Sequence, residues 1–333
     1  MGTKRIGLAR LEAMLEALDR DLDLTNATLT APTITNAVAS TFASTVGIAG
    51  ALTRLTPETL FRWNYIDCGS PVFSHAQSSD TATATEHKSP MAWPGTNGEV
   101  YLTDLTRLGA VTAAVETPLV EGTVPATDTE TTAAGLNMQM DQDTAADLGW
   151  ELNFGSPMGG GTAFTVGTHA GFIDMTVFCA SWGDYDAVSI GFRKAEPVND
   201  GHAPIIGAGT GDPVYSDFAT FGVHEPDLLQ IATDLNNGGT GVYTNTAVVP
   251  ADSENQRFRV TVSSAGVVTY TRVSDQPANS GTMVAAANAV AYTFDSGDVI
   301  IPYVFIHGRT HADTALLIKH LEIERTPGSS YEN

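Results

Sequence analysis

The chain has 333 residues, of which 16 are Lys or Arg and 38 are Asp or Glu, so its formal net charge is −22. This length and a 42% share of hydrophobic residues predict one large folded domain with additions, and they exclude a wholly disordered chain. No Lys or Arg occurs between Arg107 and Arg193, or between Lys194 and Arg257. Because nucleic-acid binding requires cations that neutralise phosphates, this acidic body disfavours DNA or RNA as a partner.

No apolar run approaches the roughly 20 residues that a membrane helix requires. The residues after Lys4 and Arg5 form an amphipathic pattern and lack the apolar core of a secretory signal. Cys68 and Cys179 permit one disulfide at most, and we expect both to be free and buried. The sequence therefore predicts a protein that is made in a cytoplasm, stays soluble and has no membrane partner.

Residues 1–24 carry the pattern of an amphipathic helix, with leucines spaced three, four, three and four residues apart. This is the a/d seam of a heptad repeat, and a helix of this length is marginal alone in water. The pattern favours an oligomerisation or docking helix; the alternative is a helix that lies on its own domain. The residues expected to dock, including two apolar residues of the segment that follows, are Lys4, Arg5, Leu8, Arg10, Leu11, Leu15, Leu18, Leu22, Leu29 and Ile34.

Residues 26–51 are rich in Thr, Ala, Ser and Asn, and two Thr-aliphatic-Thr triplets flank Pro32. We expect short extended segments that gain order by pairing with copies of themselves or with a neighbour; the alternative is a simple linker. Thr56-Pro57-Glu58 has the pattern of a helix N-cap followed by proline, which predicts a short helix through Leu60 and Phe61. Residues 67–98, rich in Ser, Thr, Pro and Gly, are expected to form a loop.

Residues 99–326 read as strand after strand with turns between them. Residues 256–263 alternate polar and apolar side chains, Ser264-Ala265-Gly266 supplies a turn, and 267–271 continue as a second strand. Further strands are expected at 148–154, 172–180, 187–192, 218–223, 228–235, 299–306 and 316–323. The sequence therefore predicts an all-β fold, an antiparallel jelly-roll sandwich preceded by an N-terminal α-helix and an extended Thr-rich segment.

These patterns predict how the chain is divided into regions. Residues 1–60 form the docking or oligomerisation segment, 61–134 an irregular connection with short strands, 135–326 the jelly-roll domain and 327–333 a tail. The last predicted strand is long enough to close a sheet beside the first.

Catalytic patterns are sparse. Jelly-roll glycosidases carry Glu-x-Asp-x-x-Glu on one strand, which puts paired carboxylates on one face, and this chain lacks that motif. Glu151, Asp174, Glu322 and Glu324 lie on predicted strands but are separated from one another, except for the last two, which share a strand. The sequence thus favours a protein that is not an enzyme, with a hydrolase as the minority interpretation.

Metal patterns are equally weak. His307-x-x-x-His311 lies between two predicted strands, which favours a turn with exposed imidazoles. Asp184-x-Asp186 and Asp141-x-Asp143 offer hard oxygen ligands without the longer Asp/Asn/Gly loop of a calcium site. We expect no metal and no cofactor.

A set of short segments stands out along the chain: Asp141-Gln142, Gly149, residues 163–167, 187–194 and 235–238, and Phe294-Asp295-Ser296-Gly297-Asp298. Together they resemble the concanavalin-like jelly-roll domain of virion proteins from tailed bacteriophages, and the opening residues 4–10 resemble the start of many such proteins. The resemblance implies a structural component of a phage particle, often a trimer. Beside it, Gly191 is expected to relieve crowding in a curved sheet and Phe164 and Phe192 to fill the core.

These observations predict a non-enzymatic virion protein, a capsid decoration (cement) or head-fibre component that is attached by its N-terminal segment and displays the jelly roll. Its expected partners are further copies, as a homotrimer, and other virion proteins such as the major capsid protein; its location is the virion, after synthesis in the host cytoplasm. The alternative is a tail-fibre, receptor-binding protein that recognises host glycans. Its candidate glycan contacts are Trp150, Trp182, Tyr185 and Tyr215, although large aromatic residues in a sandwich usually belong to the core.

Overall fold

The chain divides into two compact units, Met1–Leu52 and Thr53–Asn333. The computed structural model describes residues 58–69, 72–73, 88–95, 100–108, 121–123, 135–138, 149–155, 162–197, 215–224, 228–235, 241–273, 282–308 and 315–327, all in the second unit. The predicted N-terminal helix and the Thr-rich segment lie outside the described residues, so their docking role stays a prediction.

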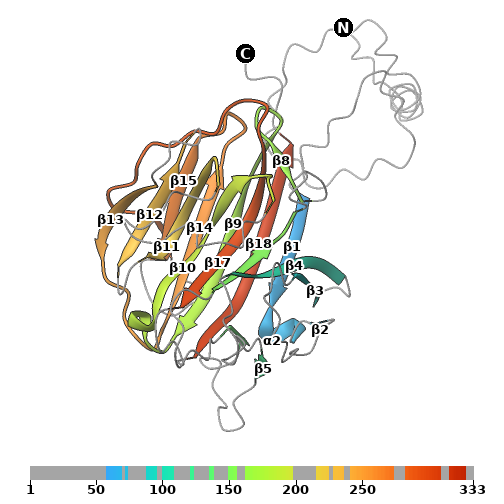
Figure 1. Ribbon diagram of the computed structural model, residues 1–333, viewed down its shortest axis with the longest axis vertical. Helices are drawn as coiled ribbons and strands as arrows, with labels where there is room; N and C mark the ends of the chain where they lie inside the picture. Colours follow the sequence, from blue (N-terminus) through green and yellow to red (C-terminus); the bar gives the residue numbers. More distant parts are fainter. Residues whose placement is uncertain are drawn as a thin grey trace, which may run out of the picture. The chain divides into compact units, whose positions relative to one another are not determined.

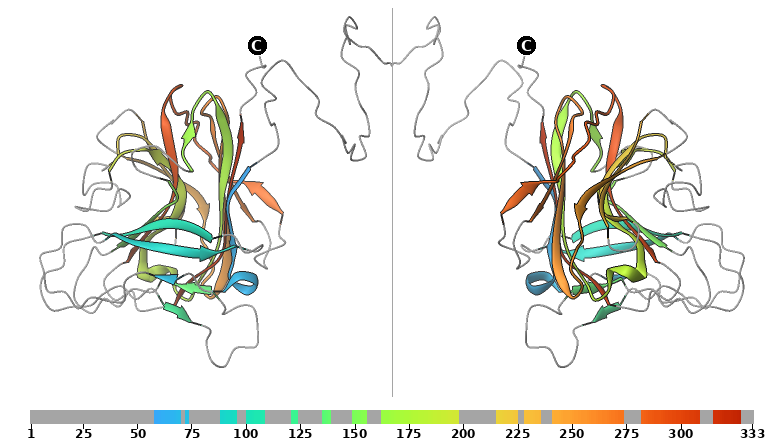
Figure 2. Two further views of the ribbon diagram at one scale, coloured as in Figure 1. Left: turned by 90° about the vertical axis from the view of Figure 1, so that its right-hand side faces the viewer. Right: turned by 90° about the vertical axis from the view of Figure 1, so that its left-hand side faces the viewer.

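The described part is an antiparallel jelly-roll sandwich of two sheets, shown in Figures 1 and 2. Sheet A has the order β16-β15-β14-β9-β18-β6-β5, and β1 also pairs with β18. Its strands are β1 (Glu58–Asn64), β5 (Glu121–Thr123), β6 (Gly135–Asn137), β9 (His169–Cys179), β14 (Glu254–Val262), β15 (Val268–Val273), β16 (Met283–Ala285) and β18 (Leu316–Pro327).

Sheet B has the order β13-β12-β11-β10-β17-β7-β4-β3-β2, and β8 also pairs with β17. Its strands are β2 (Val72–Phe73), β3 (Lys88–Pro94), β4 (Val100–Leu108), β7 (Gly149–Asn153), β8 (Phe164–Thr165), β10 (Tyr185–Lys194), β11 (Phe218–His224), β12 (Leu229–Asp234), β13 (Val242–Val248) and β17 (Val299–Gly308). The described helices are one turn each, α2 (Tyr65–Cys68) and the 3-10 helix η1 (Trp182–Asp184).

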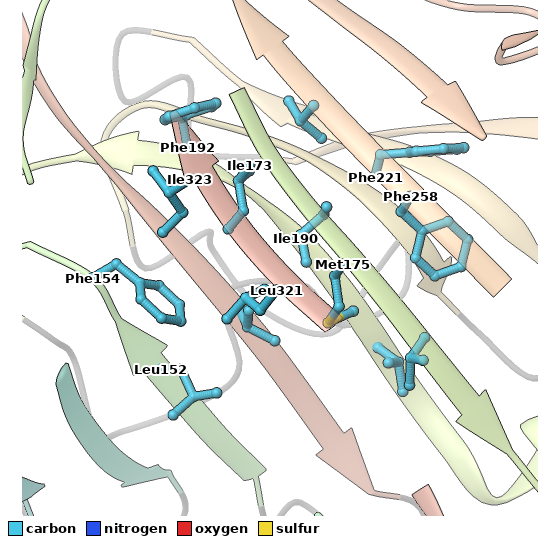
Figure 3. Close-up of a cluster of buried hydrophobic side chains, with 14 of the residues drawn as sticks. Leu152, Phe154, Ile173, Met175, Ile190, Phe192, Phe221, Phe258, Leu321 and Ile323 are labelled. Atoms are coloured by element: carbon cyan, nitrogen blue, oxygen red, sulfur yellow. The ribbon is translucent and has the colours of Figure 1, made fainter. Parts of the chain in front are cut away.

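The main core lies between the two sheets, where alternate side chains of both sheets meet (Figure 3). Phe164 and Phe192, both predicted to be core residues, are fully buried and pack edge to face at 5.2 Å between ring centroids. Aromatic pairs in this geometry add to the stabilisation that burial alone provides. A Cβ atom on Gly191 would lie 2.1 Å from the carbonyl oxygen of Ala219, so the expected close approach at this glycine is confirmed.

The strand predictions after residue 148 are confirmed. The hairpin of β14 and β15 turns at Gly266, whose φ of 84° is the left-handed conformation that glycine adopts without strain. The last strand, β18, lies between β9 and β1 and so closes sheet A beside the first described strand. No helix among the described residues is long and apolar enough to cross a membrane. Neither cysteine is in a disulfide; Cys179 is buried as expected, whereas Cys68 is only half-buried.

Two predictions before residue 135 are wrong. The short helix expected to run through Leu60 and Phe61 is strand β1 instead, because Phe61 and Trp63 alternate into the core and the backbone pairs with β18. The expected loop at 67–98 contains β2 and β3, and β3 pairs with β4 along its whole length. Since these strands belong to the two sheets, the sandwich begins at β1 rather than at residue 135.

Candidate binding face

Sheet B has a second buried face on the side away from the main core, which we call the outer face. Cross-strand pairing sets Gln230, Gly222, Ser189, Phe305 and Glu151 in one row of this face. Neighbouring rows bring together His224, Ala187 and His307, and, on the other side, Thr220, Gly191 and Tyr303. Ala187, Tyr303 and Phe305 belong to a hydrophobic cluster that is separate from the main core. Tyr215 and Phe218 belong to the same cluster.

A buried ion pair occupies one end of the outer face. Arg193 donates from Nε and one terminal nitrogen to Glu151 Oε1 at 3.0 and 2.9 Å, and from the same terminal nitrogen to Asn153 Oδ1 at 2.9 Å. Its other terminal nitrogen donates to the backbone carbonyls of Lys194 and Glu196 at 3.0 and 2.9 Å. Since a guanidinium has five N–H donors, these five bonds use all of them.

Tyr215 completes this cluster. Its hydroxyl donates to Glu151 Oε2 at 2.5 Å, and its ring lies 4.1 Å from the Arg193 guanidinium carbon. Burial and the neighbouring Glu151 raise the pKa of the Tyr215 hydroxyl well above its usual range, although Arg193 opposes the shift. Both carboxylate oxygens of Glu151 are therefore engaged by donors, and the tyrosine remains protonated.

The middle of the outer face is polar without being satisfied. Ser189 Oγ, Gln230 Oε1, the Tyr303 hydroxyl, and both ring nitrogens of His224 and His307 are buried and have no hydrogen-bond partner among the described residues. Asp186 Oδ2 lies 3.6 Å from His307 Nδ1. Buried polar groups are nearly always hydrogen-bonded, so a set of five such side chains on neighbouring strands indicates a place for water or a ligand.

Small side chains lie between these polar groups. Strand β10 contributes only Ala187, Ser189 and Gly191 to the centre of the face, and Gly222 lies between Ser189 and Gln230. Phe305 and His307 hold their rings nearly parallel, 3° apart, at 6.2 Å between centroids. Burial lowers the pKa of His224 to about 3, so this imidazole is neutral and offers one donor and one acceptor.

The outer side of sheet A holds the other carboxylates named from the sequence. Asp174 is buried and accepts bonds from Arg257 at 2.8 and 3.1 Å and from Arg259 at 2.7 Å. Glu322 is opposite Asp174 in the register and bonds with Arg62. Burial opposes ionisation of Glu322, but hydrogen bonds from His320 and Arg62 outweigh it and lower its pKa to about 2. These carboxylates act as acceptors in ion pairs, and Glu151 lies on the other sheet.

The residues predicted as glycan contacts lie mostly in the interior. Trp182, Tyr185 and Tyr215 are at most 1% exposed, so in this structure they are core side chains and present no ring face to the solvent. Trp150 lies on β7, but its side chain falls outside the described residues. The Lys, Arg, Leu and Ile residues of the docking segment fall outside them as well.

The expectation of exposed imidazoles in a turn at His307-x-x-x-His311 is wrong for His307, which lies on β17 and is 1% exposed. His311 is outside the described residues, as are Asp141 and Asp143. Within the described ranges, no group of three or more His, Cys, Asp and Glu side chains could hold a metal ion, and this includes Asp184 and Asp186.

In the sequence, Glu151, Tyr215 and His307 were considered separately and for other roles, and Ser189 and Gln230 were not singled out, because no local motif joins these residues. Ser189, Gln230 and His307 come from three strands and meet only through the sheet pairing. The sequence carries no signal for this face, because the burial of β11 and β12 on both sides is visible only in the structure.

Neither a protein-family profile nor a curated relative matches this chain. Solved structures with a similar fold include the lectin from Bauhinia forficata in complex with GalNAc, with 13% identity, coverage of 82% of this chain and 99% of that chain, and a TM-score of 0.40. The Lotus tetragonolobus seed lectin has 10% identity, coverage of 81% and 100%, and a TM-score of 0.40. A protein of unknown function from Shewanella oneidensis has 11% identity, coverage of 69% and 81%, and a TM-score of 0.37.

Proposed function

We propose that this chain is a non-enzymatic component of a tailed-phage particle, a capsid decoration or head-fibre protein that is attached by the residues before β1 and displays its jelly roll. Its partners are further copies of itself, as a trimer, and the capsid protein, and its location is the virion. The observation that carries the proposal is the division of the chain: the sandwich closes its own core within the second unit, and the leucine seam lies in the first. A displayed head needs a core of its own, which the sandwich has.

The engaged carboxylates support a role without catalysis. A general acid or base must exchange a proton with its substrate. Glu151 is held by Arg193 and Tyr215, and Asp174 by Arg257 and Arg259, so neither oxygen pair is left for that exchange.

Attachment to particles tests the proposal. Replacing Leu11 and Leu18 by Asp puts charge on the seam, and we expect the full-length chain to lose its place on virions while its far-ultraviolet circular dichroism stays that of a β protein. The matched control is Glu12→Ala, which lies outside the seam. Retained attachment of the double variant, or absence of the wild-type chain from purified virions, would refute the anchor. A copy number that scales with the capsid lattice supports decoration, and a few copies per particle support a fibre.

A second function, recognition of host-surface glycans by the jelly roll, is favoured by the unsatisfied polar side chains of the outer face. Binding sites for small ligands combine apolar and aromatic walls with a few placed polar groups, as this face does. A glycan array probed with the full-length chain tests it, and an array without any hit would exclude it.

A further inference from the structure

We propose that the sandwich has a fixed orientation on the particle: the end at which the chain enters β1 and leaves β18 faces the capsid, and the opposite end is presented outward. The inference rests on the proposed attachment by the residues before β1 and adds to it the surface of the jelly roll that meets the particle. Its basis is the pairing of β1 with β18, which lie side by side in sheet A (Figure 1).

The register places the two chain connections together. Glu58, the first residue of β1, is opposite Arg325 of β18, and the Arg325 guanidinium donates to the Glu58 carboxylate at 2.9 Å. Arg325 also donates to the backbone carbonyl of Ala163 at 2.9 Å. Pro327, the last residue of β18, is opposite His169, the first residue of β9. The residues before β1 and those after β18 therefore leave the sandwich from one end, which we call the near end.

Three tight turns complete the near end and are joined by backbone hydrogen bonds. They contain Gly167, Gly266 and Gly297, whose φ angles of 95°, 84° and 93° lie in the left-handed region. The amide of Gly167 donates to the carbonyl of Ser264 at 2.7 Å, and the amide of Gly297 donates to the carbonyl of Val166 at 2.9 Å. Because a surface that is already ordered avoids the entropy cost of ordering loops on binding, this end suits a permanent contact.

The length of the connection decides which end faces the particle. The first compact unit ends at Leu52, so Thr53–Pro57 join it to β1. A stretch of this length spans at most about 18 Å when it is fully extended. Strand β18 has 12 residues, which extend over about 40 Å between the two ends of sheet A. A first unit that is bound to the particle therefore brings the near end toward it, because the connection is too short to return to the opposite end.

The opposite end, which we call the far end, carries exposed side chains on fixed elements. Helix α2 follows β1 at this end, and η1 follows β9. The backbone amide of Trp182 in η1 donates to Asp252 Oδ1 at 2.8 Å, and its indole nitrogen donates to the carbonyl of Ala251 at 3.1 Å. Ile66 of α2 and Val249, just after β13, are 54% and 65% exposed. Side chains at these two positions therefore report whether the far end is covered on the particle.

Cysteine labelling on intact virions tests the orientation. The background is the full-length chain with Cys68→Ser, in which the remaining Cys179 is buried. One cysteine at a time is then introduced at an exposed position of either end. The near-end replacements are Thr168→Cys and Ser296→Cys, and the far-end replacements are Ile66→Cys and Val249→Cys. Each variant reacts with a polyethylene-glycol maleimide, once as purified protein and once on virions, and the two rates are compared.

We expect the near-end cysteines to react about tenfold more slowly, or slower still, on virions than in the free protein, because a stable contact covers them. The far-end cysteines should react equally fast in both. In the reverse order, protein labelled at the far end should attach to particles that lack the chain, and protein labelled at the near end should not.

The contrary outcomes separate the orientation from the attachment. Near-end cysteines that react as fast on virions as in the free protein, or a near-end label that leaves attachment intact, would overturn the orientation while attachment stands. Protection of the far-end cysteines on virions would overturn it as well. Absence of the wild-type chain from virions would overturn both the attachment and the orientation.

Discussion

His224 makes the stability of the sandwich depend on pH in a predictable direction. Burial lowers the pKa of this imidazole from 6.5 to about 3, and neither ring nitrogen has a hydrogen-bond partner among the described residues. The unfolded chain therefore binds a proton at a higher pH than the folded chain does. As the pH falls below 6.5 the unfolded state is favoured progressively, and the loss is complete only below the folded pKa.

The magnitude follows from the two pKa values. A pH of 5 lies about 1.5 units below the pKa of the histidine in the unfolded chain, so the free energy of unfolding is about 2 kcal/mol lower at pH 5 than at pH 7.5. At pH 4 the loss reaches about 3 kcal/mol, a large share of the 5–15 kcal/mol by which domains are usually stable. Carboxylates change stability over the same range, so the contribution of His224 must be isolated by difference.

The variant His224→Phe provides that difference, because it keeps a ring in the same place and removes the titration. Urea unfolding of wild type and variant should be followed at several pH values between 4 and 7.5. We expect the free energy of unfolding of the variant, relative to that of the wild type, to rise by about 2 kcal/mol when the pH is lowered from 7.5 to 5. A difference that stays constant over this range would refute the argument, since the carboxylates are common to both proteins.

Further perturbations test the packing and the buried charges by urea unfolding. Arg193→Met leaves Glu151 buried without its cation and should lower the free energy of unfolding by about 3–5 kcal/mol, the usual range for breaking a buried pair. A decrease of less than about 1 kcal/mol would contradict the buried ion pair. Gly191→Ala should cost about 2 kcal/mol or more, because its Cβ would lie 2.1 Å from a carbonyl oxygen, whereas Gly241→Ala, with its nearest neighbour at 3.4 Å, should stay within about 0.5 kcal/mol; equal effects would contradict the close approach. Phe192→Ala should cost about 3–5 kcal/mol, and Leu102→Ala, at 75% exposure, close to nothing; the reverse order would place the core elsewhere.

Strands were predicted well wherever local chemistry set them. Residues 256–271 show the alternation of a half-buried hairpin, and the glycine needed for its turn is at position 266, so β14 and β15 followed from the sequence. The prediction for strand β1 was wrong because a distant partner, rather than local chemistry, sets this strand. Its neighbour Thr56-Pro57-Glu58 resembles a helix start, while the partner that holds Arg62 in a strand is Glu322, 260 residues away. Long-range pairing overrode the local propensity.

The outer face shows the limit more sharply. Alternation identifies one buried side of a strand, because apolar and polar residues alternate when the other side meets the solvent. In the sequence, Thr220 and Gln230 look like the solvent-facing half of an ordinary amphipathic strand, although both sides of β11 and β12 are buried in the structure. Only the register, which pairs Gly222 with Ser189 and with Gln230, shows that these polar groups share one enclosed surface.

The two proposed functions make different demands on the outer face, and its buried polar side chains therefore distinguish between them. A purely structural head has no use for five buried polar side chains without hydrogen-bond partners in the part of the chain that the structure describes, since replacing a buried unsatisfied group with an apolar one of similar shape is neutral or stabilising. Ser189, Gln230 and His307 therefore cost stability that the sandwich could avoid with Ala, Met and Phe at the same positions. If these three replacements raise the melting temperature and leave virion attachment intact, the face is not part of the scaffold, and its polar groups require a ligand to explain them.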